Sequence, residues 1–163
     1  MIKILIGKEA VDFATKEEAL KEIISGYIDI EGGESIYCIL DRAKEEVEAG
    51  GDRIVFISNF YLDGHDIGGH FYDEIPQNFF DEKRNMIRAL VLGKIHEYKA
   101  KEEAIDELKK LIPEVEQYDH KNHCCLSEDP YEIERLWFNI ELIKRGATRV
   151  VDINSKIPDG FYD

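Results

Sequence analysis

The residues best suited to chemistry lie in a polar turn that follows an apolar run. The segment 54–57 is continuously apolar, the chain becomes polar by Asn59, and Asp63, His65 and Asp66 then stand among three glycines. This pattern predicts a buried strand that leads into a loop at its carboxyl end. Because ligands of open α/β sheets bind beyond the carboxyl ends of the strands, Asn59 and its loop are the first candidate site.

The same loop contains residue types that bind metals. Asp63, His65 and Asp66 are followed by His70 and Asp73, and carboxylates with imidazoles are ordinary metal ligands. Their spacing matches no known zinc pattern and no H-E-x-x-H motif. A solvated polar loop is therefore the favoured interpretation.

A second candidate zinc site is the cluster of His120, His123, Cys124 and Cys125. Adjacent residues of a strand point to opposite faces, so the two thiols cannot readily bind one ion, and we expect buried strand thiols instead. The chain has no glycine-rich nucleotide-binding motif and no G-x-S-x-G motif, so enzymatic activity has little support. We predict no metal site and assign no catalytic residue.

Composition limits the classes of partner. The chain has 163 residues, enough for one domain with an apolar core. Its 35 acidic and 21 basic residues give a net charge of −14, which would repel nucleic acids and anionic membranes. A basic protein partner, or simple solubility, fits this charge better. The sequence has no recognisable signal peptide, membrane span or internal repeat, and its three cysteines favour reduced thiols in the cytoplasm.

The first third of the chain alternates strand and helix patterns. Apolar runs predict strands at 2–6, 36–40 and 53–58. Thr15 and Glu18 form a capping box before a helix that we expect to end near Gly26, and a short polar helix follows from Asp41. This β-α-β-α-β order is typical of a parallel sheet.

The rest of the chain is expected to be mostly helical. Apolar residues recur at helical spacing over 81–112, which predicts one or two added helices, and 115–122 is expected to be loop. A short strand at 123–126 precedes a helix that begins at Asp129 and ends at Gly146. The buried face of that helix consists of Ile133, Leu136, Trp137, Ile140 and Ile143, and a fifth strand is expected at 149–153.

Three stretches together resemble the receiver domain of bacterial response regulators. Residues 59–66 (NFYLDGHD) resemble the loop that carries the phosphoacceptor aspartate of that family. Residues 125–133 resemble its fourth strand, switch residue and fourth helix, and 146–158 resemble its G-A-x-x-Y-x-x-K-P run. The resemblance, over roughly 1–75 and 122–158, implies a doubly wound flavodoxin-like α/β fold with five parallel strands. The chain would then be one receiver-like domain, 1–163, with a helical insertion at 77–121.

The residues expected in the phosphorylation pocket depart from the family pattern. The positions equivalent to that pocket are Lys8, Glu9, Asn59, Ser127 and Lys156. An amide at position 59 cannot form an acyl phosphate, and Lys8 replaces one carboxylate of the pair that would hold Mg²⁺, which weakens any metal site.

The resemblance therefore implies a degenerate receiver, or pseudo-receiver. Its expected function is to bind a protein partner in signalling or regulation, independently of phosphorylation and without a cofactor, and an inhibitor is one version of this function. A homodimer is a further expectation. The alternative is a small metal-dependent phosphatase or hydrolase that uses Glu9 and the acidic loop 63–70, with Asp63, His65 and Asp66.

Overall fold

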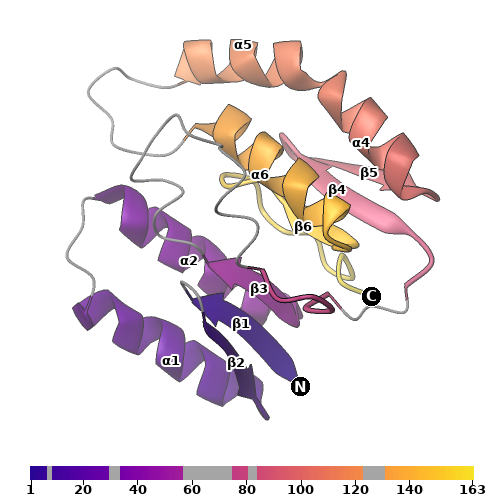
Figure 1. The fold of residues 1–163 in the computed structure, drawn as a ribbon. Coiled ribbons are helices and arrows are strands. Elements are labelled where there is room, and N and C mark those ends of the chain that lie inside the picture. Colours follow the sequence, from indigo (N-terminus) through magenta and orange to yellow (C-terminus); the bar gives the residue numbers. More distant parts are fainter. Residues whose placement is uncertain (7–8, 30–33, 57–74, 81–83, 123–130) are drawn as a thin grey trace. The chain divides into compact units, whose positions relative to one another are not determined.

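The computed structural model describes residues 1–6, 9–29, 34–56, 75–80, 84–122 and 131–163 (Figure 1). The chain divides into two compact units. The first unit contains residues 1–79 and 158–163, and the second unit contains residues 80–157.

The described part of the first unit is a three-stranded sheet with two helices. Its elements are β1 (Ile2–Ile6), β2 (Glu9–Phe13), α1 (Lys16–Asp29), α2 (Glu34–Glu48) and β3 (Arg53–Phe56). The strand order is β2-β1-β3, in which β1 pairs antiparallel with β2 and parallel with β3.

Apolar residues that alternate along the strands and recur at helical spacing along α1 and α2 form the core of the first unit. Its buried members are Ile4, Ala19, Ile23, Ala43, Val47 and Ile54. The predicted cap of α1 is confirmed, because the Glu18 N–H donates to Thr15 Oγ1 at 3.2 Å and Glu18 Oε2 accepts from the Ala14 N–H at 3.2 Å. The C-terminal residues join this unit, where the Tyr162 hydroxyl donates to Glu46 Oε1 at 3.4 Å.

Among the described residues, the second unit repeats this arrangement with one helix more. The strand order is β5-β4-β6, and β4 pairs antiparallel with β5 and parallel with β6. Residues 30–33 alone separate α1 from α2, whereas an additional helix, α5, stands between α4 and α6. The elements of the second unit are β4 (Ile87–Val91), β5 (Lys94–Tyr98), α4 (Lys101–Lys109), α5 (Ile112–Asn122), α6 (Glu132–Lys144) and β6 (Arg149–Val151).

The two units also match residue by residue. In the hairpins, Ile2 pairs with Phe13 and Ile87 pairs with Tyr98, so equivalent positions lie 85 residues apart. The sequence Lys-Glu-Glu-Ala at 16–19 recurs at 101–104 with the same separation. Ala19 and Ala104 are both fully buried, which shows that the small residue has the same packing role in α1 and α4.

The third strand of each unit begins with the same arginine contact. Arg53 Nη1 donates to the carbonyl oxygens of Met1 at 3.1 Å and Asp52 at 2.7 Å. Arg149 Nη1 donates to those of Met86 at 2.6 Å and Thr148 at 2.8 Å. Arg149 lies 96 residues after Arg53, and the two arginines tie β3 and β6 to the start of β1 and β4, respectively. We call this contact the arginine clamp.

Gly50 and Gly146 end α2 and α6 in the same way, with φ angles of +107° and +110°. Their N–H groups donate to the carbonyl oxygens of Val47 at 3.1 Å and of Ile143 at 3.0 Å, respectively.

Residues with a side chain rarely adopt such a φ angle. We therefore expect Gly50→Ala and Gly146→Ala each to lower the free energy of unfolding by about 1 kcal/mol in a urea titration. Arg145→Ala is the control, since Arg145 has φ −89°, and a change as large as that of Gly146→Ala would contradict this account.

The predicted five-stranded parallel, flavodoxin-like sheet is wrong, because the structure has two three-stranded sheets, each with an antiparallel pair. Residues 36–40, expected as a strand, belong to α2. A short apolar run suits a buried helix as well as a strand, so periodicity could not decide between them. The first strand at 2–6 and the end of α6 near Gly146 are confirmed.

The predicted helical insertion at 77–121 is also wrong, because residues 87–98 form the β4–β5 hairpin. Leu92 and Gly93 have φ angles of +49° and +82°, as required at the two central positions of a tight hairpin turn. Residues 115–122, expected as loop, belong to α5, where Pro113 lies in the first turn and breaks no helix. The strand expected at 123–126 lies outside the described residues.

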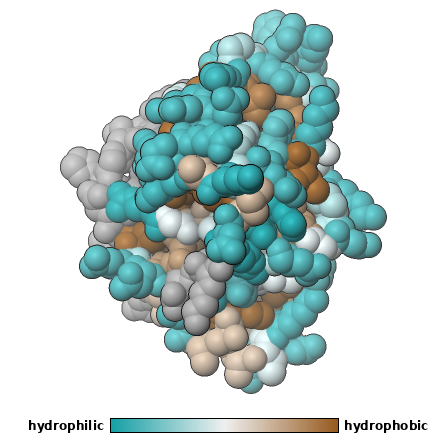
Figure 2. All heavy atoms as spheres, turned by 90° about the vertical axis from the view of Figure 1, so that its right-hand side faces the viewer, coloured by the Kyte–Doolittle hydropathy of each residue, from teal (hydrophilic) through white to brown (hydrophobic). Residues whose placement is uncertain are grey.

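Figure 2 shows hydrophilic residues over much of one face, in keeping with the net charge of −14. Among the described residues, no helix combines the length and the apolar character needed to cross a membrane.

Candidate functional site

Most residues of the predicted phosphorylation pocket lie outside the described part of the chain. These are Lys8, Asn59 and Ser127, together with the loop residues Asp63, His65 and Asp66. Glu9 begins β2 in the first unit, and Lys156 follows β6 in the second unit. Whether these residues form one pocket therefore stays a prediction.

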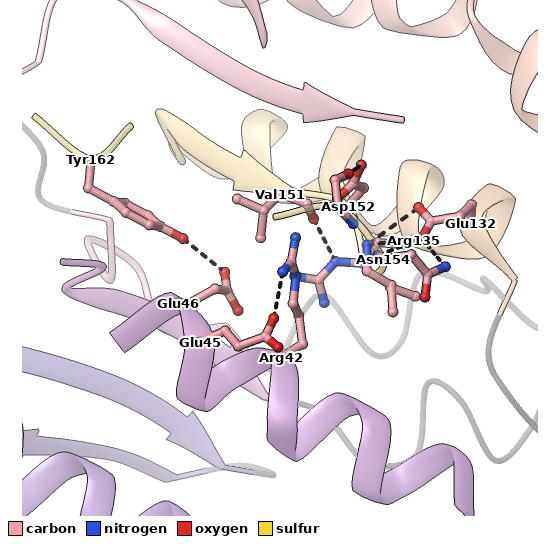
Figure 3. A network of polar contacts seen from close by, with 11 residues as sticks. Arg42, Glu45, Glu46, Glu132, Arg135, Val151, Asp152, Asn154 and Tyr162 are labelled. Atoms are coloured by element: carbon pink, nitrogen blue, oxygen red, sulfur yellow. Dashed lines mark hydrogen bonds and ion pairs between the residues drawn. The ribbon is translucent and has the colours of Figure 1, made fainter. Parts of the chain in front are cut away.

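A different polar cluster lies in the second unit, at the carboxyl end of β6 (Figure 3). Glu132 is the first residue of α6, and Asp152 directly follows β6. Arg135 and Asn139 lie one and two turns further along α6. All four side chains are at least 95% buried, which is uncommon for charged residues and calls for partners.

Glu132 holds the backbone that leaves β6. Its Oε1 accepts from the N–H groups of Ile153 and Asn154, both at 3.0 Å, and from Asn154 Nδ2 at 2.8 Å. Within the described part of the chain, its Oε2 has a single hydrogen bond, a long one of 3.4 Å from the Ile153 N–H. One oxygen of this buried carboxylate is therefore saturated, and the other retains acceptor capacity.

Asp152 connects β6 to the β4–β5 hairpin. Its Oδ1 accepts from the Ser155 N–H at 3.2 Å, and its Oδ2 accepts from the Gly93 N–H at 3.2 Å and from the Ser155 hydroxyl. These bonds hold Gly93 and Ser155 beside the carboxylate, so the turn after β4 and the segment after β6 form two walls of one site.

Asp119 caps the helix that carries Glu132. Its Oδ1 accepts from the Glu132 N–H at 2.9 Å, and its Oδ2 accepts from the Ile133 N–H at 2.8 Å. The expected cap at Asp129 is wrong, because Tyr131 occupies the N-cap position and makes no capping bond with its side chain. The cap comes instead from α5, which has no counterpart among the helices described in the first unit.

Replacing Asp119 by alanine should leave two N–H groups at the start of α6 without their partner. We expect the free energy of unfolding to fall by about 2 kcal/mol in a denaturant titration. Asp119→Asn should recover part of this loss, since its amide oxygen can still accept, and Asp106→Ala on the exposed side of α4 should change little. Equal stability of Asp119→Ala and the parent would show that these bonds do not stabilise the protein.

An open pocket of about 160 Å³ lies over these residues. Seven residues line it: Leu92, Gly93, Tyr118, Glu132, Asp152, Asn154 and Ser155. The lining is rich in hydrogen-bond acceptors and contains two carboxylates. Such a site suits a ligand that donates hydrogen bonds and carries positive charge.

The charges of the pocket perturb its titratable groups. Burial, and then the negative charge of Asp152, raise the pKa of Glu132 to about 7, against the smaller opposing effects of its backbone bonds and of Arg135. Burial and the nearby carboxylates of Glu132, Asp152 and Asp119 raise the pKa of the Tyr118 hydroxyl. Arg135 thus offsets only part of the cost of ionising Glu132, and a cation bound in the pocket would favour the ionised carboxylate further.

A second, smaller cavity of about 10 Å³ shares Glu132 and Asp152 with this pocket and has Asn139 among its lining residues. Arg135 Nε and Asn139 Nδ2 both donate to the Val151 carbonyl, at 2.9 Å and 2.8 Å. The other end of the Asn139 amide, Oδ1, is buried and has no hydrogen-bond partner among the described residues. A buried acceptor in this state favours a donor from outside the protein.

A comparison with the first unit tests whether the fold requires these polar residues. The 96-residue separation that relates the arginine clamps places apolar residues of the first unit at all four polar positions. Glu132, Arg135, Asn139 and Asp152 of the second unit correspond to Ile36, Ile39, Ala43 and Phe56 of the first unit, respectively. The same arrangement of strands and helices therefore forms with apolar residues at these four positions, so the fold does not require the polar ones.

Sequence reasoning missed this site. It assigned Glu132 only to a helix start and gave Asp119, Asn139 and Asp152 no role. The usable signal was the comparison of 130–152 with 34–56, in which four apolar residues are replaced by polar ones. A comparison of the chain with family models, curated proteins and solved structures found no match.

Proposed function

We propose that the protein is a binding module for a positively charged protein partner, and that the pocket of the second unit is its recognition site. The observation that carries the proposal is the polar cluster of Glu132, Asp152 and Asn139, buried at positions where the first unit has apolar residues. Burial of charge lowers stability unless something compensates for it, and a cationic partner is that compensation.

The net charge of −14 also supports a basic partner, because it attracts positive charge over longer distances than the pocket does. An acidic surface accelerates encounter with a positively charged protein and disfavours nucleic acids. The expected role stays regulatory and independent of phosphorylation, and the three cysteines favour the cytoplasm as its location. The alternative hydrolase would use the loop 63–70, which lies outside the described residues and is not supported by the pocket.

Glu132→Gln gives the sharpest test of this proposal. The glutamine keeps an oxygen for the N–H groups of Ile153 and Asn154 but removes the charge from the pocket. Affinity capture from the native cells, with immobilised parent and variant, should recover a basic protein with the parent only. Glu116→Gln, on the exposed side of α5, is the matched control and should recover the same protein as the parent.

Capture should also weaken with salt, because it depends on charge. If the parent, Glu132→Gln and Glu116→Gln recover the same basic protein equally, the pocket is not its binding site. If no basic protein is recovered with the parent, the proposed function itself is wrong.

A further inference from the structure

We infer that the pocket of the second unit binds the guanidinium group of an arginine side chain on the partner. This inference rests on the proposed function and specifies the chemical group that the site recognises. Four observations carry it: the spare acceptor on Glu132, the unpartnered amide oxygen of Asn139, the size of the pocket and the origin of its walls.

The first two observations show what the site lacks. Among the residues that the structure describes, Glu132 Oε2 accepts only the 3.4 Å bond from the Ile153 N–H, although its carboxyl group is buried. Asn139 is 2% exposed, and its free Oδ1 belongs to a residue that lines the small cavity beside Glu132 and Asp152. Two buried acceptors therefore lack good donors among the described residues; Glu132 lines the pocket itself, whereas Asn139 lines the small cavity that shares Glu132 and Asp152 with it. A ligand with several N–H groups in the pocket would supply a donor to Glu132.

The pocket is too large for a single water or a bare ion. Its volume of about 160 Å³ is several times the ~30 Å³ that one water occupies in the liquid. A guanidinium group with part of its methylene stem is a ligand of suitable kind, and the side chains of Leu92 and Tyr118 offer surface to the stem and to the flat face of the cation.

The walls come from separate elements, which favours a planar, multidentate donor. Tyr118 comes from α5, Glu132 from α6, and Asp152, Asn154 and Ser155 from the segment after β6. Guanidinium presents five N–H donors in one plane and pairs with two acceptors at once, whereas a lysine ammonium is a compact and strongly hydrated point charge. We therefore expect the pocket to bind guanidinium more tightly than a lysine ammonium group.

Small probes test the inference on the full-length protein. We expect Nα-acetyl-L-arginine amide to bind with a millimolar Kd at pH 8, measured by calorimetry and by the shifts of the Gly93, Asn154 and Ser155 amide resonances. Nα-acetyl-L-citrulline amide has the same shape without the charge and should bind at least about tenfold more weakly. Nα-acetyl-L-lysine amide should also bind more weakly than the arginine probe.

The variants connect the probe to Glu132. Glu132→Gln should weaken binding of the arginine probe at least about tenfold, and Glu116→Gln should not change it, with thermal melting confirming that both variants are folded. Equal binding of the arginine and citrulline probes, or of the parent and Glu132→Gln, would overturn the inference.

Binding should also depend on pH through Glu132, whose pKa is about 7. The groups that face it are Asp152 after β6, Arg135 on α6, and Tyr118 and Asp119 on α5. Protonation of Glu132 between pH 8 and pH 6 should weaken the arginine probe about tenfold in the parent. A pH dependence of the same size in Glu132→Gln would count against this carboxylate as the recognition group.

Failure of this inference can be separated from failure of the proposed function. The captured partner is treated with phenylglyoxal, which modifies arginine, or acetylated on its lysines. Loss of binding after phenylglyoxal alone supports the guanidinium site. Loss after acetylation alone overturns it while the binding module stands, and absence of any basic partner removes the module itself.

Discussion

Glu132→Gln should make the protein more stable than the parent above pH 7 and should leave it little changed at pH 4. The pKa of Glu132 is about 7 in the folded protein and 4.5 in the reference state, so the folded state holds this proton more tightly. Its contribution is fully present below pH 4.5 and is lost as pH rises through 7, which amounts to about 3 kcal/mol. Glutamine has no charge to bury and avoids that loss.

The measurement is the free energy of unfolding in urea, for the parent and the variant, at several values between pH 4 and pH 8. The difference between them should grow by about 3 kcal/mol across this range. Glu116→Gln should run parallel to the parent, since its side chain is exposed. A constant difference between parent and Glu132→Gln would mean that folding does not raise the pKa of Glu132.

The second large effect is expected at the central strand of each sheet. Leu5 on β1 and Leu90 on β4 occupy equivalent positions, and both are completely buried. Leu90→Ala and Leu5→Ala should each lower the free energy of unfolding by about 3 to 5 kcal/mol, the range for a leucine that leaves a cavity in a well-packed site.

Ile95 is the control for this prediction. It lies directly opposite Leu90 on β5 but is 44% exposed, so Ile95→Ala should lower stability by about 1 kcal/mol at most. Denaturant titration of the three variants gives the comparison. Similar losses for Leu90→Ala and Ile95→Ala would show that exposure in the structure does not predict the energetic role of these two residues.

The sequence predicted structure correctly where neighbouring residues alone determine it. The run at 2–6, the Thr15–Glu18 cap and the glycine after α6 depend on near neighbours, and the structure has all three. Of the predicted face of α6, Leu136, Ile140 and Ile143 are buried. Each depends on a period or a hydrogen bond that spans only a few residues.

The errors occurred where two structures fit the same local pattern. Residues 87–98 have apolar side chains at spacings that suit a helix, and the choice of a hairpin depends on pairing with β6, more than 50 residues away. The polar cluster was harder still, because Asp119, Glu132 and Asp152 meet only after α5, α6 and β6 have packed. The repeat was missed because the equivalent positions lie 85 residues apart in the hairpins but 96 apart in the third strands.

The duplicated arginine clamp has a consequence for how the chain folds. Each central strand accepts, in parallel, a strand that begins with arginine and continues with β-branched residues, and both β3 and β6 meet this description. The unfolded chain therefore contains two interchangeable third strands, and an exchanged pairing would keep the same backbone bonds. Such a pairing is a kinetic trap within a single molecule. Refolding should show a slow phase whose rate does not depend on protein concentration, because the exchanged strands must separate before either unit can close.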